Sequence, residues 1–506
     1  MADRRMEPQQ QPPGVSLIDR SISGMVWVTL DKIGGSGVNF VITVLLARLL
    51  FPADFGLVAM AMVFFEFSSV FVESGFSTAL IREKDISGPD KSTVFIYNMG
   101  AALVSYALLF ACAPWIAAFY GIPALVTIVR VMGLSLILDA LSVVRSSVLV
   151  QRVDFRSQAL ARFGAVVLSG ALGVWMAWQG FGVWSLVARV LVNGLMLALL
   201  FYLLDPWKPQ LVFSNASFRR LFGFGSRILA AGLLDKFFSQ AYKLVIGKFF
   251  AAMALGFYTQ AGTFVNMAIN TLFRPVQTVS YPVLARLRDD LPRLKSAGRT
   301  ILRLCSFVVF PALVLLGVLA EPVIGVLIGQ KWYPAAPYLR LLCVAGATIH
   351  ISSVNLNVLL VLGRSDLSLR LEVIKKVNIA LAIIIGLRYG LPGLVIGEAV
   401  VSFVNLFINA FYSRKLLAYS PVEQISDVWP TLALSGMAGA AAWAARRVLP
   451  WEGTIGLLVL TLVGVIAYIT LHVVLRTHEW RLITGTVLPK VWTMTGKGSR
   501  LSWMRR

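Results

Sequence analysis

Arg48-Leu-Leu-Phe-Pro-Ala-Asp-Phe-Gly56 and Lys248-Phe-Phe-Ala-Ala-Met-Ala-Leu-Gly256 are two copies of one pattern, 200 residues apart. In each copy a cation precedes the glycine by eight residues. Upstream of them, Leu30-Asp31-Lys32 recurs as Leu234-Asp235-Lys236 at an offset of 204. Membrane transporters are commonly built from internal repeats. The pattern therefore predicts a chain with two halves that contain the same order of helices.

The composition places most of this chain inside a membrane. Of its 506 residues, 58% are hydrophobic and 14% are charged, whereas soluble domains are about 45–50% apolar and about 25% charged. The net charge of +22 is expected here because cytoplasmic loops retain Lys and Arg, so it does not indicate a nucleic-acid partner. With three Cys and three His, a disulfide scaffold, a zinc ribbon and most His-based metal sites are excluded.

The fold is predicted from the spacing of apolar segments, since a helix needs about 20 such residues to cross a bilayer. Gly, Pro and charged residues divide the chain into fourteen segments, at 20–47, 54–80, 93–119, 123–148, 160–179, 182–204, 220–247, 253–280, 299–320, 333–362, 367–388, 391–416, 428–447 and 453–476. Six helices separate the two copies of the pattern, so both copies run in the same direction. We therefore predict an all-α integral membrane protein of about fourteen transmembrane helices: two six-helix bundles related by an axis along the membrane normal, plus two C-terminal helices.

These segments also predict the domain boundaries. In chain order we expect a disordered cytoplasmic tail at 1–19, an N-terminal lobe at 20–204, a cytoplasmic linker at 205–219, a C-terminal lobe at 220–416, the last two helices at 428–476 and a basic cytoplasmic tail at 477–506.

The loop charges predict the orientation. One set of loops and tails holds about thirty cations, and the other holds only Arg48, Lys248, Lys331, Arg340, Arg388, Arg446 and Arg447. Because cytoplasmic loops are enriched in Lys and Arg, the first set, which includes both termini, is predicted to be cytoplasmic. No loop is long enough for a nucleotide-binding or catalytic domain, which argues against an ATP-driven pump and against an enzyme.

Charged residues also occur within the predicted helices. The cations are Lys32, Arg130, Arg189, Arg227, Lys236, Lys243, Arg274, Lys375 and Lys376, and the acids are Asp31, Glu66, Glu73, Asp139, Asp235, Glu372 and Glu398. A charge at the centre of a bilayer costs roughly 2.5–3.5 kcal/mol on insertion scales. Charges near the middle of a helix are therefore expected to face one another or water.

Helical spacing aligns polar side chains into stripes. The stripes are Lys236, Gln240 and Lys243, with Lys32, Ser36 and Asn39 as their counterparts in the first copy; Asn266, Asn270, Arg274 and Gln277; Arg189 and Asn193; and Glu398, Ser402, Asn405 and Asn409. Such stripes either form interhelical hydrogen bonds and ion pairs or line a wetted cavity. For the first, seventh and eighth helices a net cationic cavity is favoured, which suits an anionic substrate such as a phosphate.

The stretch Leu46-Ala-Arg-Leu-Leu-Phe-Pro-Ala-Asp-Phe-Gly56-Leu-Val-Ala-Met60, followed by Glu73-Ser-Gly-Phe-Ser-Thr-Ala-Leu-Ile81, resembles the opening of the Wzx-type polysaccharide exporter (oligosaccharide flippase) family, especially its colanic acid exporter subgroup. That family belongs to the multidrug/oligosaccharidyl-lipid/polysaccharide exporter superfamily. The resemblance implies two lobes around a central cavity with alternating access in a bacterial inner membrane. It also implies the substrate, an undecaprenyl-diphosphate-linked oligosaccharide flipped to the periplasmic leaflet for exopolysaccharide or lipopolysaccharide biosynthesis. A polysaccharide polymerase and a chain-length regulator are the implied protein partners.

With that substrate, the residues within the membrane divide into three candidate roles. The diphosphate ligands are expected to be Lys32, Lys236, Lys243, Arg274 and Arg189. The sugar ligands are expected to be Asn39, Gln240, Asn266, Asn270 and Gln277. Coupling to H⁺ or Na⁺ is expected at Asp31, Asp235, Glu66 or Glu398, although Asp31 and Asp235 directly precede lysines and have charge balance as an alternative role; no other cofactor is expected.

The same residues also bear on other possible functions. A multidrug cation antiporter of the same superfamily needs an acidic, aromatic cavity, and the lysines argue against it. An intramembrane ligase or polymerase needs a long periplasmic loop, and a scaffold has no need of charges within its helices. A flippase for the peptidoglycan precursor has similar chemistry and stays open as an alternative.

Overall fold

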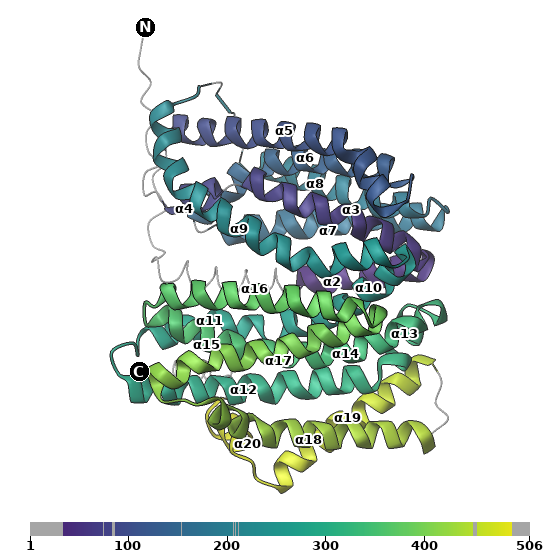
Figure 1. Cartoon of the computed structure of the whole chain (residues 1–506), viewed down its shortest axis with the longest axis vertical. Coiled ribbons are helices and arrows are strands. Elements are labelled where there is room, and N and C mark those ends of the chain that lie inside the picture. The colour runs from purple at the N-terminus through teal and green to yellow at the C-terminus, as the bar shows by residue number, and fades with distance from the viewer. Residues whose placement is uncertain are drawn as a thin grey trace, which may run out of the picture. The chain divides into compact units, whose positions relative to one another are not determined.

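The computed structural model describes residues 34–487, except for 74, 83–86, 153, 206, 208, 211 and 449–452 (Figure 1). This part of the chain is helical and contains no strand. Nine of its helices are long and apolar enough to cross a membrane. The predicted all-α membrane fold is confirmed, and the count of fourteen crossings stays a prediction. The predictions for the N-terminal tail, for Asp31 and Lys32, and for the end of the basic tail lie outside the described residues.

The contacts divide the chain into two compact units, and each is described by itself. The first unit comprises residues 1–49 and 61–239, and the second comprises 50–60 and 240–506. The boundaries between the units fall after residues 49, 60 and 239, and the domain boundaries expected from the sequence stay a prediction. The predicted C-terminal helices at 428–476 belong to the second unit.

The first unit is a bundle of apolar helices. Its helices are α2 (Ser36–Leu49), α3 (Pro52–Glu73) from Ala61 onward, α4 (Phe76–Arg82), α5 (Gly88–Tyr120), α6 (Leu125–Gln151), α7 (Phe155–Trp178), α8 (Val183–Leu204) and α9 (Asn215–Phe249) as far as Ser239. Helix α5 begins with a capping box, in which Ser87 Oγ accepts from the Asp90 amide and the Asp90 carboxylate accepts from the Ser87 amide. It ends at Gly121, which has the left-handed backbone conformation of a helix C-cap (φ 70°). Arg220 of α9 also pairs with Asp90 at 2.6 Å, which fixes α9 to the start of α5.

The second unit is built around α12 (Leu291–Val318). Its other helices are α10 (Ala252–Leu272), α11 (Arg274–Ala285), α13 (Ala320–Leu327), η2 (Gln330–Ala335), α14 (Ala336–Gly346), α15 (Ile349–Val361), α16 (Ser365–Leu387), α17 (Gly390–Leu417), α18 (Pro421–Val448), α19 (Gly453–Val474), α20 (His478–Leu482) and η3 (Ile483–Val487). Helix α12 packs against α14, α15 and α18. Arg299 of α12 forms a bidentate pair with Asp427 of α18, at 2.8 and 2.6 Å, and Arg303 reaches the same carboxylate at 2.7 Å. Bidentate Arg–carboxylate pairs fix geometry as well as supplying energy, so they hold α18 in place.

Two predicted continuous helices are broken at matching positions. The segment 54–80 is interrupted after Glu73, where Gly75 has a φ of 67°, a conformation that glycine adopts readily. The segment 253–280 is interrupted at Phe273, and the next helix begins at Arg274 with Pro275 in its first turn. The segment 333–362 is likewise divided into α14 and α15. Because the first two breaks are 200 residues apart, they support the internal repeat.

The two copies of the repeated pattern contact each other reciprocally within the second unit. A Cβ at Gly56 would lie 1.7 Å from the carbonyl oxygen of Ala252, and one at Gly256 would lie 1.9 Å from that of Pro52. Any side chain at either glycine would therefore force the backbones apart. The glycines recognised in the sequence as repeat markers are those that let the first turns of α3 and α10 meet.

Candidate functional site

Three carboxylates and one ammonium group form a cluster in the first unit, which we call the Glu66 cluster: Glu66, Glu73, Asp139 and Lys236. Lys236 of α9 forms an ion pair with Glu66 of α3, and both side chains are partly exposed. The charges of Lys236 and Glu66 act on Glu73, which lies two helical turns further along α3. The charges of Glu73 and Glu66 act on Asp139 of α6. A group with more carboxylates than cations favours the uptake of a proton.

The ion pair changes the interpretation of Lys236. The stripe of Lys236, Gln240 and Lys243 predicts a cationic surface, but the charge of Lys236 is compensated by Glu66. Because Glu66 lies 170 residues away on a different helix, helical spacing does not reveal this contact. Asp235 is exposed on α9 beside it.

Arg189 provides a second polar contact in the first unit. Its Nη2 donates a hydrogen bond to the Asn39 side-chain oxygen, which joins α8 to α2. Gly173 of α7 permits this arrangement, because a Cβ there would lie 3.2 Å from the Arg189 Cβ. One turn further along α8, Asn193 donates to Ser169 Oγ at 3.3 Å. The structure thus brings together one predicted diphosphate ligand and one predicted sugar ligand.

The second unit holds a different acidic site, which we call the Glu398 site: Glu398, Tyr258, Tyr242 and Lys243. The Tyr258 hydroxyl donates to Glu398 Oε2 at 2.8 Å, from α10 to α17. The charge of Lys243 acts on Glu398, and Glu398 in turn acts on Tyr242. The hydroxyl of Tyr242 is buried and has no hydrogen-bond partner among the described residues. The site therefore contains one acid, one cation and spare hydroxyl capacity.

The remaining polar stripes have separate environments. Along α17, Ser402 donates to the Glu398 carbonyl, and Asn405 accepts a long hydrogen bond of 3.5 Å from Asn378 of α16. These contacts include the interhelical bonds considered as one interpretation of the stripes. The Oε1 of Gln240 is buried with no partner among the described residues.

The predicted stripe Asn266, Asn270, Arg274 and Gln277 does not lie on one continuous helix. Asn266 and Asn270 belong to α10, whereas Arg274 and Gln277 belong to α11, beyond the break at Phe273. Asn266 and Arg274 are exposed, and the other two are half-buried. The spacing argument that placed the four on one face therefore holds only within each pair.

Sequence reasoning did not assign a role to Glu73, Asp139, Tyr258 or Tyr242. Glu73 and Asp139 were visible as acids in apolar segments. Only the tertiary fold brings Asp139 next to α8, where a Cβ added to Gly194 would lie 3.4 Å from Asp139 Oδ1. The tyrosines carried no such signal, because tyrosine is also common at helix ends near the membrane surface. Among the described residues, no group of three or more His, Cys, Asp or Glu side chains is arranged to hold a metal ion.

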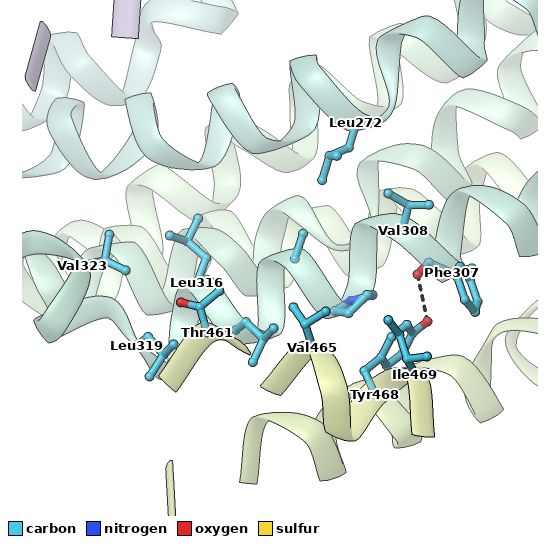
Figure 2. Close-up of a pocket in the computed structure, with 13 residues that line it drawn as sticks. Leu272, Phe307, Val308, Leu316, Leu319, Val323, Thr461, Val465, Tyr468 and Ile469 are labelled. Carbon is cyan, nitrogen blue, oxygen red and sulfur yellow. Dashed lines mark hydrogen bonds between the residues drawn. The ribbon is translucent and has the colours of Figure 1, made fainter. Parts of the chain in front are cut away.

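The second unit also contains an apolar cavity of about 510 Å³ between α12, α13 and α19 (Figure 2). Leu316, Val465 and Ile469 are among its lining residues, and the Tyr468 hydroxyl is directed to the carbonyl of Phe307 at 2.8 Å. This cavity offers no charged group to an anion. Its chemistry suits hydrocarbon.

Comparison with known proteins assigns the family. A family model described as "Polysaccharide biosynthesis protein" matches residues 45–337, which is more than half of the chain. The chain belongs to this polysaccharide biosynthesis protein family. The family match begins at residue 45, directly before the stretch 46–60 that carried the resemblance, and the predicted Wzx-type relationship is confirmed.

Curated relatives of this polysaccharide biosynthesis protein are similar over much of its length. It is 28% identical over 319 residues to the succinoglycan biosynthesis transport protein ExoT of Rhizobium meliloti, a match that covers 63% of this chain and 65% of ExoT. It is 24% identical over 439 residues to the lipopolysaccharide biosynthesis protein WzxC of Escherichia coli, covering 83% of this chain and 88% of WzxC.

The fold is similar to that of a solved transporter. The lipid II flippase MurJ, in an inward closed conformation, aligns with a TM-score of 0.72 and 15% identity over 90% of this chain and 99% of MurJ. At that identity the likeness establishes the fold alone.

Proposed function

We propose that this protein flips an undecaprenyl-diphosphate-linked oligosaccharide repeat unit from the cytoplasmic to the periplasmic leaflet for exopolysaccharide or lipopolysaccharide biosynthesis. Membership in the polysaccharide biosynthesis family carries the proposal. The charged and amide side chains on the apolar helices of both units support it, because such groups within membrane helices mark substrate and ion pathways.

The physical task accounts for these polar groups. A sugar head is too polar to cross about 30 Å of hydrocarbon, and its prenyl tail is too apolar to leave the membrane. A polar interior that opens alternately to the two sides, while the tail stays in lipid, removes both obstacles. The implied location is a bacterial inner membrane, with both termini in the cytoplasm.

The proposed ligands of the diphosphate are the cations named from the sequence. They are Lys32, Lys236, Lys243, Arg274 and Arg189, of which Arg189 is already oriented by Asn39. A guanidinium matches phosphate oxygens with several donors at once. The proposed sugar contacts are Asn39, Gln240, Asn266, Asn270 and Gln277, whose amides both donate and accept hydrogen bonds.

The ion pair of Lys236 and Glu66 suggests how binding and ion uptake are coupled. A diphosphate that draws Lys236 to itself leaves Glu66 without its cation, and Glu66 then takes up H⁺ or Na⁺. Glu398 serves as a second coupling site in the other unit, beside Lys243. Asp31 and Asp235 are the remaining candidates from the sequence.

Two other substrates belong to the same chemistry. A peptidoglycan-precursor flippase handles a similar lipid diphosphate, and the likeness to MurJ concerns the fold alone. A multidrug antiporter requires an acidic site for a cationic drug, which the Glu66 cluster in isolation resembles. The relatives named for polysaccharide biosynthesis favour the exopolysaccharide or lipopolysaccharide precursor. A polysaccharide polymerase and a chain-length regulator would act next.

The test is a deletion strain, in which lipid-linked oligosaccharides are assigned to a leaflet and secreted polymer is measured. We expect complete repeat units to accumulate on the cytoplasmic side and polymer to disappear. Normal intermediates and normal polymer would contradict the proposal, and loss of peptidoglycan synthesis instead of polymer would move it to the peptidoglycan precursor.

Point variants test the proposed ligands in the same strain. Lys243→Ala and Arg274→Ala are expected to lower polymer at least about tenfold, because a charge-assisted hydrogen bond contributes roughly 1.5–3 kcal/mol. Membrane insertion should be unchanged by immunoblot of the membrane fraction. Arg388→Ala, which removes a cation from the end of α16, is the control and should complement fully. Full complementation by both test variants would remove these residues from the site.

A further inference from the structure

A second cavity in the second unit has a feature that the first cavity lacks: two arginines at one end. It has a volume of about 770 Å³ and lies between α12, α14, α15, α17 and α18. Most of its lining is apolar, including Phe310, Val344 and Trp443, and the charged lining residues are Arg340 and Arg446. Ligand pockets of roughly 300–1,000 Å³ with an apolar lining and a few placed polar groups are typical of small-molecule sites.

The two arginines share one carboxylate. Arg340 Nη2 lies 2.8 Å from Glu321 Oε1, and Arg446 Nη2 lies 3.0 Å from Glu321 Oε2. All three side chains are 39–45% exposed, so a ligand can reach them. Two cations against one anion leave one net positive charge in this triad. Each guanidinium has five N–H donors, and the contact with Glu321 uses one nitrogen of each.

The rest of the cavity suits hydrocarbon. Val344 of α14, Phe407 of α17 and Trp429 of α18 line it and are 47%, 48% and 60% exposed. Along α18 the lining extends from Ile425 to Arg446, which corresponds to about 30 Å at 1.5 Å per residue. A long apolar channel that ends at two arginines is complementary to a lipid with one anionic head group and a long acyl chain.

We propose that this cavity binds one anionic glycerophospholipid, with its phosphate at Arg340 and Arg446 and an acyl chain along α18. The single net charge of the triad matches the single negative charge of a phosphatidylglycerol head. A zwitterionic head brings a cation close to the arginines and gains less. This lipid is a bound component of the protein and is distinct from the transported substrate, whose proposed ligands lie elsewhere in the chain.

The experiment measures lipid binding to the full-length protein by native mass spectrometry. Phosphatidylglycerol and phosphatidylcholine with identical acyl chains are titrated into the detergent-solubilised protein. We expect one tightly bound phosphatidylglycerol per chain, at about tenfold lower lipid concentration than phosphatidylcholine, which corresponds to about 1.4 kcal/mol. Equal binding of both lipids would overturn the proposal, and so would co-purification of a lipid-linked oligosaccharide in this cavity.

Three test variants and one control separate the charge contribution from a structural one. Arg340→Gln/Arg446→Gln should abolish the tenfold preference, whereas the control Arg370→Gln/Arg388→Gln, which also removes two cations, from α16, should keep it. Glu321→Gln should strengthen phosphatidylglycerol binding, because it frees both arginines; a purely structural triad predicts a lower melting temperature and no gain. Val344→Trp should lower the binding of both lipids by filling the channel. An unchanged preference in the Arg340/Arg446 variant overturns the proposal, and because no transport is measured, this outcome is independent of the proposed function.

Discussion

The Glu66 cluster and the Glu398 site occupy the two units of one repeated architecture, yet their acids have different kinds of partner. Glu66 has a lysine as its direct partner and two further carboxylates nearby. Glu398 has a tyrosine hydroxyl as its direct partner and a lysine that acts on it. An ion pair exchanges partners when a charged ligand arrives, whereas a neutral hydrogen bond permits the acid to gain or lose a proton without losing its partner.

The shared architecture shows which features the repeat constrains. Gly56 and Gly256 make reciprocal contacts, and both copies contain a broken helix at the corresponding place. The acids have no such correspondence, since Glu66 lies on α3, the helix that begins within the first pattern, and Glu398 lies on α17. The repeat therefore constrains backbone packing, and each unit has acquired its own polar chemistry.

The largest effect is expected where the two copies touch. Gly56→Ala and Gly256→Ala each place a Cβ within 2 Å of a backbone oxygen, so the helices must separate. Overpacking of this kind costs typically 1–3 kcal/mol, and we expect a lower melting temperature in detergent and a severe loss of polymer in cells. The two variants should be equally impaired, because the contact is reciprocal.

The control for this contact is Gly262→Ala in α10, where the nearest neighbour of an added Cβ is the Leu342 side chain at 4.0 Å. Alanine favours helix over glycine by about 1 kcal/mol, so this variant should be neutral or stabilised. Unchanged melting of both Gly56→Ala and Gly256→Ala would contradict the close contact between the two backbones.

The next effect distinguishes the ion pair from the hydrogen-bonded acid. Glu66→Gln and Lys236→Gln each leave one charge without its partner, while the double variant leaves neither. The side chains are 27% and 38% exposed, so water reduces the cost to about 1–2 kcal/mol, below the 3–5 kcal/mol of a fully buried pair. We expect the double variant to melt closer to the wild type than either single variant does.

A double-mutant cycle on melting temperature gives the coupling between Glu66 and Lys236 directly. Additive effects of the two substitutions on melting temperature would mean that the residues act independently. That result would contradict the proposed exchange of partners. Transport in the double variant should still fail, because the proposed coupling acid is lost even though stability is restored. Recovery of both properties would assign the pair to stability alone.

How far the sequence predicted this molecule depends on the distance between the residues involved. The helices, the repeat and the family follow from local pattern. The contact that Gly56 and Gly256 permit does not, since it was found only in the fold. The pair of Lys236 with Glu66 spans 170 residues, and that of Tyr258 with Glu398 spans 140. Periodicity places residues on one helix face and contains no information about which other helix faces them. It also treated residues 253–280 as one helix, because a proline in a transmembrane segment is compatible with either a kink or a break.

The smallest effect is expected at the tyrosines of the Glu398 site, and it tests whether the hydroxyl matters to the acid. Tyr258→Phe removes the donor to Glu398 and should cost about 1 kcal/mol, the net worth of a typical hydrogen bond. Tyr242→Phe is the matched control on α9, since the Tyr242 hydroxyl has no partner among the described residues. Because it removes a buried unsatisfied group, this variant should leave the stability of the protein unchanged or slightly raise it. If Glu398 couples transport to an ion, Tyr258→Phe should also change how polymer export depends on external pH or Na⁺, and Tyr242→Phe should not. Identical behaviour of the two variants in both measurements would leave Glu66 as the stronger coupling candidate. The ion pair of Glu66 with Lys236, and not the hydrogen bond of Glu398, would then be the contact that matters for transport.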